Sequence, residues 1–253
     1  MDSLDNFLNF HIEKLTVNQD IPVDILKVAA QIDASVEERL MMPEAAVDIK
    51  NGHFHIYLQS NFRDLPGAAL RRRFSLAHEI AHTLFYERQE GELKSRKDSP
   101  KGDRLEAACH KAAALILVPS QALRSEVGRQ EVSNSAVLVG LANRFEVSTE
   151  VMLRRLNEFG GFEDNWAPVL TRRNGEAFEI EYAAYPPWLK SHLGKPHIGM
   201  DLSTWFRPTE SSGGVLTRKL ADAKLEARPF QITGSKTIFE LRILPPEIST
   251  EEI

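Results

Sequence analysis

The sequence predicts an α+β protein, and three observations support this fold class. Apolar residues recur at helical spacing over residues 69–86 and again over 104–119. Alternating apolar runs flank Asn51-Gly52, a dipeptide that strongly favours a two-residue β-hairpin turn. In the last third of the chain, β-branched and aromatic runs such as residues 237–244 are typical of strands. We therefore expect helices together with small sheets.

Composition is consistent with a cytoplasmic protein of one or two domains. The 253 residues are 42% hydrophobic, which is enough for a substantial core. The net charge of −5 provides no general attraction to nucleic acid. The single cysteine, Cys109, excludes an intrachain disulfide and fits a reducing compartment. No segment resembles a signal peptide and no apolar run approaches the roughly 18 residues of a membrane span, so we expect no membrane association.

The N-terminal part is predicted to contain a helix followed by a hairpin. Residues 22–32 form an amphipathic pattern whose buried side would carry Ile25, Leu26, Val28 and Ala29. Residues 45–49 and 54–58 are then expected to pair as strands across the Asn51-Gly52 turn.

Residues 78–82 read His-Glu-Ile-Ala-His and are the most informative part of the sequence. Histidines four positions apart project from the same side of a helix, so the imidazoles of His78 and His82 can converge on one metal ion. Glu79 would then lie beside the metal without binding it, in the position of a general base. The alternative is a core helix with two incidental histidines, which would need other polar partners once buried.

A third ligand is expected from elsewhere, because a catalytic zinc site uses three protein ligands and keeps one position for water. Residues 104–119 form a second predicted helix, rich in alanine and ended by Pro119. Glu106 and His110 lie four positions apart on it and share a face. Glu106 is the predicted ligand, with His110 beside or behind it. The alternative for Glu106 is a solvated first-turn glutamate favoured by the helix dipole.

At these two helices the chain resembles the ImmA/IrrE-type zinc metallopeptidases, through the segments RRRFSLAHEIAHTLFY and RLEAACHKAAALILVPSQAL. The resemblance covers about residues 20–160 and implies a zincin-like helical core with a small sheet. It places Glu106 at the position of the family's metal-binding glutamate. The family usually has Asn where this chain has His110, and often an acidic residue where it has Ala108. His110 is therefore expected either to support a ligand or to act as an additional one.

The predicted site would hydrolyse a peptide bond with the help of a metal. Zn²⁺ is the expected cofactor, with Mn²⁺ or Fe²⁺ as alternatives, because a His-His-Glu set accepts several divalent ions. Such an ion lowers the pKa of a water that it binds and polarises a carbonyl. Glu79 would accept a proton from the water and return it to the leaving amine.

Three further side chains are candidates for the cleft. In zinc peptidases of this plan an edge strand lies above the active-site helix and pairs with the substrate. His53 and His55, on the second predicted strand, could therefore face the cleft, with a solvated strand face as the alternative. Tyr86, at the end of the predicted helix, is the third candidate. The charged segment 87–103 is predicted to be a surface loop near the rim of the cleft.

Residues 135–159 are predicted to form a helix, a tight turn and a second helix with Ser148 as its N-cap. The arginines here are offset by glutamates, so a packing or protein-docking role is favoured over direct DNA binding. We predict three parts: a zinc metallopeptidase domain over residues 1–130, this helix-turn-helix-like segment over 131–162, and a smaller α+β domain over 163–253. Some members of the family carry a C-terminal sensory domain, which makes signal reception the hypothesis for the last part.

Two functional hypotheses follow. In the first, the protein is a zinc-dependent endopeptidase, and the resemblance implies that it cleaves a transcriptional repressor or antitoxin-like regulator in a stress or mobile-element response. In the second, the metal is structural and the chain is a regulatory protein that acts by binding protein or DNA. Glu79 favours the first hypothesis, since a structural metal site has no use for a base beside its water.

Overall fold

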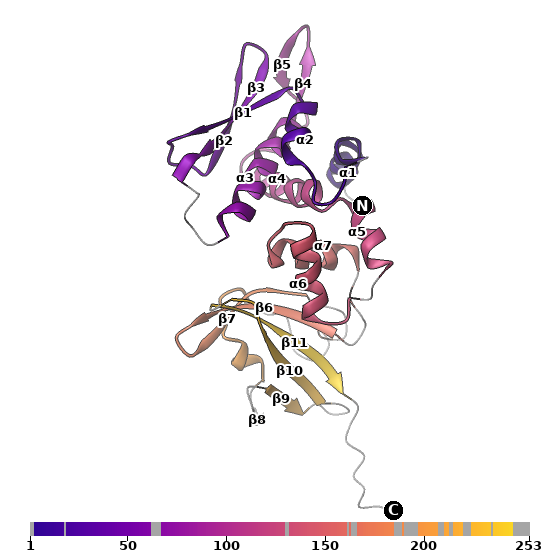
Figure 1. Cartoon of the computed structure of the whole chain (residues 1–253), viewed down its shortest axis with the longest axis vertical. Helices are drawn as coiled ribbons and strands as arrows, with labels where there is room; N and C mark the ends of the chain where they lie inside the picture. Colours follow the sequence, from indigo (N-terminus) through magenta and orange to yellow (C-terminus); the bar gives the residue numbers. More distant parts are fainter. Residues whose placement is uncertain are drawn as a thin grey trace, which may run out of the picture. The chain divides into compact units, whose positions relative to one another are not determined.

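The structure is a computed structural model that describes residues 3–17, 19–61, 67–129, 132–160, 162, 166–184, 189, 197–206, 210–212, 215–219, 224–233 and 235–244. The chain divides into two compact units (Figure 1). The first consists of Met1–Arg129 with Leu141–Val151, and the second of Gln130–Gly140 with Met152–Ile253. Helices and separate sheets are both present, so the predicted mixed α+β class is confirmed, whereas the division into three parts stays a prediction.

The part of the chain before residue 130 contains helices on either side of a short run of strands. In chain order these are α1 (Ser3–Thr16), α2 (Ile25–Gln31), β1 (Ala34–Arg39), β2 (Ala45–Lys50), β3 (His53–Gln59), α3 (Ala68–Thr83), β4 (Tyr86–Gln89), β5 (Glu92–Ser95), α4 (Asp103–Leu117) and α5 (Ser120–Val127). Both helices of the predicted metal site are present. However, α3 ends at Thr83, and Tyr86 begins a strand instead of ending the helix.

A three-stranded sheet packs against α3. Its order is β1-β3-β2, with β1 parallel and β2 antiparallel to β3. Asn51 and Gly52 connect β2 to β3 with φ values of 52° and 74°, the left-handed conformation that a type I′ turn requires. The predicted hairpin is therefore confirmed. Strand β2 lies at the edge of the sheet, and both β2 and β3 contact α3.

Helix α2 begins where the side chain of Asp24 accepts hydrogen bonds from the backbone N–H groups of Leu26 and Lys27, each at 3.2 Å. Its buried residues are Ile25, Val28 and Ala29. Leu26 is 58% exposed, so its predicted burial is wrong. In a helix of seven residues, positions i, i+3 and i+4 from Ile25 form one narrow face, and the neighbouring position 26 points away from it.

The charged segment after α3 differs from the prediction of a simple loop. Residues 86–95 form a hairpin of β4 and β5 that turns at Glu90 and Gly91, with φ values of 53° and 86°. The loop is therefore confined to the residues between β5 and α4. Arg96 anchors its start, because its backbone N–H donates to the carbonyl of Phe85 at 2.8 Å.

The second unit is built on a sheet of order β7-β6-β11-β10-β9-β8, in which the paired strands are antiparallel. Its elements are β6 (Trp166–Asn174), β7 (Ala177–Ala183), η2 (Leu202–Phe206), β8 (Glu210–Ser212), β9 (Val215–Lys219), β10 (Lys224–Gln231) and β11 (Lys236–Leu244). One face carries a buried cluster that includes Val169, Leu225 and Phe239. Among the residues described after position 165, only Leu189 and η2 are helical, so this region contains less helix than the predicted α+β domain.

The predicted helix pair is present as α6 (Ser135–Arg144) and α7 (Thr149–Phe159), and each helix contributes residues to both units. Glu146, with a φ of 50°, lies in the turn between them. The side chain of Ser148 caps α7, because its Oγ accepts the N–H of Val151 at 3.2 Å. The predicted N-cap is confirmed.

Replacing Ser148 by Ala should lower the free energy of unfolding by about 1 kcal/mol, because the N–H of Val151 loses its acceptor. Urea denaturation followed by circular dichroism measures the change. Ser148→Asp keeps a capping oxygen and is the matched control, expected to stay within about 0.5 kcal/mol of the wild type. Equal stability of the Ala variant and the wild type would contradict the cap.

Candidate metal centre

Helix α3 places three of the predicted site residues within little more than one turn. His78 and His82 are half-buried and project from the same side of the helix. Their rings lie 4.9 Å apart, centre to centre, at an angle of 75°. Glu79 lies between them in sequence and is only 9% exposed. The helix therefore presents two imidazoles together, with a buried carboxyl group next to them.

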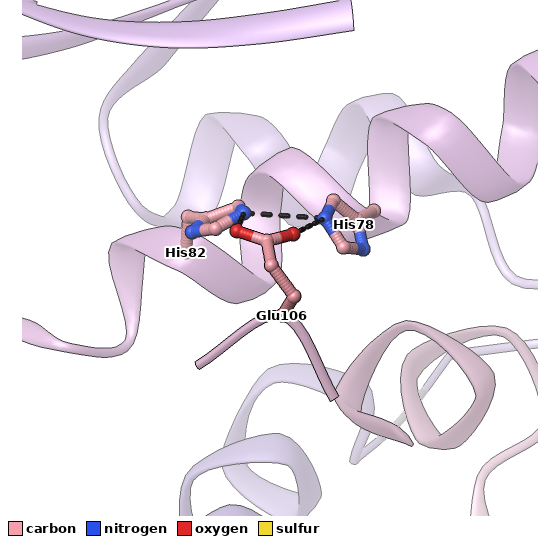
Figure 2. A group of neighbouring side chains, drawn as sticks. All are labelled: His78, His82 and Glu106. Carbon is pink, nitrogen blue, oxygen red and sulfur yellow. Dashed lines mark hydrogen bonds and ion pairs between the residues drawn. The ribbon is translucent and has the colours of Figure 1, made fainter. Parts of the chain in front are cut away.

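Helix α4 brings Glu106 to the two imidazoles. Its Oε2 lies 3.2 Å from Nε2 of His78, and its Oε1 lies 3.6 Å from Nε2 of His82. The two Nε2 atoms are themselves 3.2 Å apart. Figure 2 shows the carboxylate of Glu106 directed between the two rings. Side chains from two different helices thus converge on one point.

These separations fit a divalent metal. Two ligand atoms of a tetrahedral zinc ion lie about 3.3 Å apart, since each is about 2.0–2.1 Å from the metal. The three observed separations, 3.2, 3.2 and 3.6 Å, are close to that value. Two nitrogens and one carboxylate are also a donor set that zinc and related ions accept. His78, His82 and Glu106 could therefore hold a metal ion.

The protonation of His78 also suits metal binding. Burial lowers its pKa, and the nearby His110 and His82 lower it further, although Glu106 acts in the opposite direction. The pKa of His82 is likewise lowered, chiefly by burial. Neutral imidazoles keep a lone pair for a metal, whereas protonated ones do not. Burial therefore favours the neutral imidazole in both His78 and His82, which is the form that binds a metal.

Glu79 is in an environment that favours its neutral form. Burial raises the pKa of Glu79 to about 7, and the negative charge of Glu106 contributes to the rise. A backbone hydrogen bond from Val47 opposes the rise, because it stabilises the carboxylate. A carboxyl group with a pKa near neutrality can both take up and release a proton, which is the property of a general base.

Val47 belongs to the open edge of the small sheet. The N–H of Gln59, at the end of β3, donates to the carbonyl of Glu44, just before β2. Glu44 and Gln59 therefore form a hydrogen-bonded pair in the register of the two strands. In an antiparallel pair every second residue bonds to the partner strand. Ala45, Val47 and Ile49 therefore direct their N–H and C=O groups away from β3. The N–H of Val47 bonds to Glu79, and that of Ile49 donates to Oδ1 of Asp48 at 2.8 Å. The N–H of Ala45 and the outward C=O groups of this edge are available to pair with an extended chain.

A cavity of about 510 Å³ lies beside Glu79 and His82. The edge strand contributes Ala46 and Val47 to its wall, and Phe85 follows from the end of α3. The remaining lining comes from β4, the end of β5, the loop that follows it and the start of α4, through Tyr86, Ser95, Arg96, Ser99, Pro100, Lys101, Gly102 and Leu105. The cavity is therefore continuous with the cluster and with the strand edge.

The structure separates the three candidates for the cleft. Tyr86 lines the cavity. His53 instead places Nδ1 2.6 Å from the carboxylate of Asp33, and His55 bonds to the hydroxyl of Ser35 at 2.8 Å. Neither histidine lines this cavity, because both belong to the central strand and turn toward residues of, or just before, β1. Of the two alternatives for His53 and His55, the structure therefore favours the solvated strand face over a position in the cleft.

His110 lies beside the cluster. Its ring centre is 4.6 Å from that of His78 and 5.7 Å from that of Phe74, on which it stacks. The group whose ligand atoms lie within 4.8 Å of one another contains His78, His82 and Glu106 but not His110. Of the two expected roles, this geometry favours support of His78 over direct ligation.

The cavity residues of the loop, including Arg96 and Lys101, were not predicted individually. The available signal was the charge of the segment between the two metal helices, which indicated only that it lies near the cleft. Arg96 and Lys101 lie near His82 because the β4–β5 hairpin folds the chain back toward the end of α3. The hydrogen bond from the N–H of Arg96 to the carbonyl of Phe85 holds the end of the hairpin there.

Two packed helices hold the His-His-Glu cluster beside the small sheet, an arrangement that suits a metallopeptidase. Residues 67–157, from the start of α3 into α7, match the model of a peptidase family described as the IrrE N-terminal-like domain. This match supports the resemblance of these residues to the ImmA/IrrE-type family. A search of curated proteins returned no match to the chain. No helix within the described ranges is long and apolar enough to cross a membrane.

Removing any one of His78, His82 or Glu106 should reduce metal affinity by more than about 100-fold. Loss of a residue that only supports a ligand typically reduces affinity by roughly 10- to 100-fold, and loss of a ligand should cost more. Alanine variants would be loaded with zinc, dialysed and analysed for metal by mass spectrometry. His55→Ala is the matched control, since His55 lies outside the cluster and should retain the metal of the wild type. Full metal content in the Glu106 variant would exclude Glu106 as a ligand.

Replacing His110 by Ala should weaken zinc binding by about 10-fold and leave one ion per chain, because the ring positions His78 without contributing a ligand atom. Competition with a chromophoric chelator gives the affinity. Complete loss of the ion would instead assign His110 as an additional ligand.

Proposed function

We propose that the protein is a zinc-dependent endopeptidase that cleaves a protein partner. The observation that carries this proposal is the convergence of His78, His82 and Glu106, with Glu79 buried next to them. The open edge of β2 and the adjoining cavity support it, because an extended polypeptide needs both a backbone partner and room for side chains. The match of residues 67–157 to the model of a peptidase family supports the same reaction.

Each residue has a distinct role in the proposed reaction. When bound by His78, His82 and Glu106, a divalent ion would supply Lewis acidity to the attacking water and to the scissile carbonyl. Glu79 accepts a proton from the water and donates it to the leaving amine. The N–H and C=O groups of Ala45 and the C=O group of Val47 hold the substrate backbone extended alongside α3, while the N–H of Val47 bonds to Glu79. An edge strand of this kind can bind the interior of a chain as readily as its end, which supports an endopeptidase.

The proposed partner is a transcriptional repressor or an antitoxin-like regulator, whose cleavage would relieve repression in a stress or mobile-element response. This choice rests on the family resemblance. In the same proposal the residues after position 162 receive the signal that controls cleavage.

The arginines of α6 and α7 support a packing or docking role for this helix pair rather than direct contact with DNA. Arg144 pairs with Glu126 at 3.0 Å, and the guanidinium of Arg154 lies 4.5 Å from the centre of the Tyr182 ring. Arg155 is buried and pairs with Glu158 at 2.7 Å. Phosphate contacts require exposed cations that are not neutralised by neighbours.

Replacing Glu79 by Gln should leave zinc content unchanged and reduce cleavage by about 100- to 10,000-fold, because the amide cannot accept the proton of the water. The assay incubates the zinc-loaded protein with a repressor encoded next to its gene and follows the fragments by mass spectrometry. Glu13→Gln, an exposed change on α1, is the matched control and should cleave like the wild type.

Equal cleavage by the wild type and the Glu79→Gln variant would remove the catalytic assignment of Glu79. Absence of cleavage of every repressor tested, with zinc bound, would instead favour the regulatory alternative in which the metal has a structural role.

A further inference from the structure

The cavity beside the cluster has a cationic wall. Two of its lining residues, Arg96 and Lys101, carry positive charge, and among the described residues that line it Glu79 is the sole carboxylate. A divalent ion bound by two neutral imidazoles and one carboxylate would give the metal centre a net charge of +1, so the centre and Glu79 together carry no net negative charge, whether Glu79 is ionised or neutral. The positive charge of the remaining lining then comes from Arg96 and Lys101.

Arg96 is held in a fixed position. Its Nε donates to the carbonyl of Leu84 at 3.0 Å, and its Nη1 donates to the carboxylate of Glu87 at 2.9 Å. The ring of Phe7 lies 5.6 Å from the guanidinium, and the backbone N–H of Arg96 bonds to Phe85. A side chain fixed in this way loses little conformational entropy when a ligand binds to its remaining donors. Glu87 offsets much of its charge, so Arg96 contributes mainly directed N–H groups.

Lys101 supplies the charge that is not offset. It lies on the exposed loop immediately before α4, and no carboxylate in the described parts of the chain forms an ion pair with its ammonium group. The neighbouring walls are apolar or hydroxylic: Phe85 and Leu105 provide carbon surface, and Ser99 turns its hydroxyl to the carbonyl of Phe85 at 3.2 Å. The cavity thus combines an apolar wall with a cationic rim.

We propose that this cavity is a specificity subsite for an acidic side chain of the substrate, Asp or Glu. The carbon stem of that side chain lies against Phe85 and Leu105, and its carboxylate binds Lys101 and the free donors of Arg96. Lys101 is the specificity-determining residue, because Arg96 is already paired with Glu87. The inference rests on the proposed endopeptidase function and defines the class of sequence that the site selects.

The test uses a positional-scanning library of acetylated and amidated peptides, in which each position is fixed in turn as Glu or Gln. Capping both ends removes terminal charges, so any preference for Glu comes from a side chain. Zinc-loaded wild-type protein should cleave the Glu pool about tenfold faster than the Gln pool at one position relative to the scissile bond.

Two lysine variants then identify the residue responsible. Lys101→Glu should abolish the preference for Glu and favour Lys at the same position, because the rim charge is reversed. Lys97→Glu is the matched control, since Lys97 is exposed on the same loop but does not line the cavity, and it should keep the wild-type preference. Equal rates for the Glu and Gln pools at every position, or an unchanged preference in Lys101→Glu, would overturn the proposal.

A binding assay separates this inference from the proposed reaction. Fluorescence anisotropy of the same capped pools with zinc-loaded Glu79→Gln protein reports recognition without turnover, and tighter binding of the Glu pool at one position supports the subsite. Tighter Glu binding without cleavage by the wild type would refute the endopeptidase and keep the subsite. Cleavage without any preference for Glu in either assay would refute the subsite and keep the endopeptidase.

Discussion

The packing of α3 against α4 is the constraint on which the candidate site depends. His78 and His82 are brought together by the helical repeat alone, but Glu106 reaches them only because a second helix lies close by. Fully buried alanines occur on both helices, Ala77 and Ala81 on α3 and Ala112 and Ala113 on α4. Small side chains permit a short distance between helix axes. Since metal–ligand distances tolerate changes of only about 0.2 Å, the core packing and the metal site form a single structural requirement.

The predictable parts of the fold and site are those set by local sequence. Two histidines four positions apart must share a helix face, and Asn51-Gly52 tolerates the left-handed backbone that its turn requires. Glu106 was a weaker case, because any first-turn glutamate is explained by the helix dipole. Its assignment depended on the family resemblance, and only the tertiary structure brings its carboxylate to within 3.2 Å of His78.

The parts that were missed depend on pairing between distant residues or on weak local signals. Strand β1 (Ala34–Arg39) has a mostly polar sequence, and its parallel pairing with β3 is invisible in a local pattern. That pairing also makes β3 the central strand, which directs His55 to Ser35 instead of the cleft. The β4–β5 hairpin turns at Glu90-Gly91, a dipeptide without the strong turn preference of Asn-Gly. Its charged residues therefore resembled a loop.

In the proposed endopeptidase, the exposed edge of β2 would allow a small number of residues to select the substrate. Unpaired edge strands are a liability in a soluble protein, since they accept other strands without regard to sequence. Here the edge strand β2 contacts the helix that carries Glu79, and the N–H of Val47 bonds to that side chain. An extended chain that pairs with this edge has side chains on alternating sides, so only every second side chain can approach the cavity. Backbone pairing would supply binding that is independent of sequence, and the charge of one subsite would then supply the discrimination.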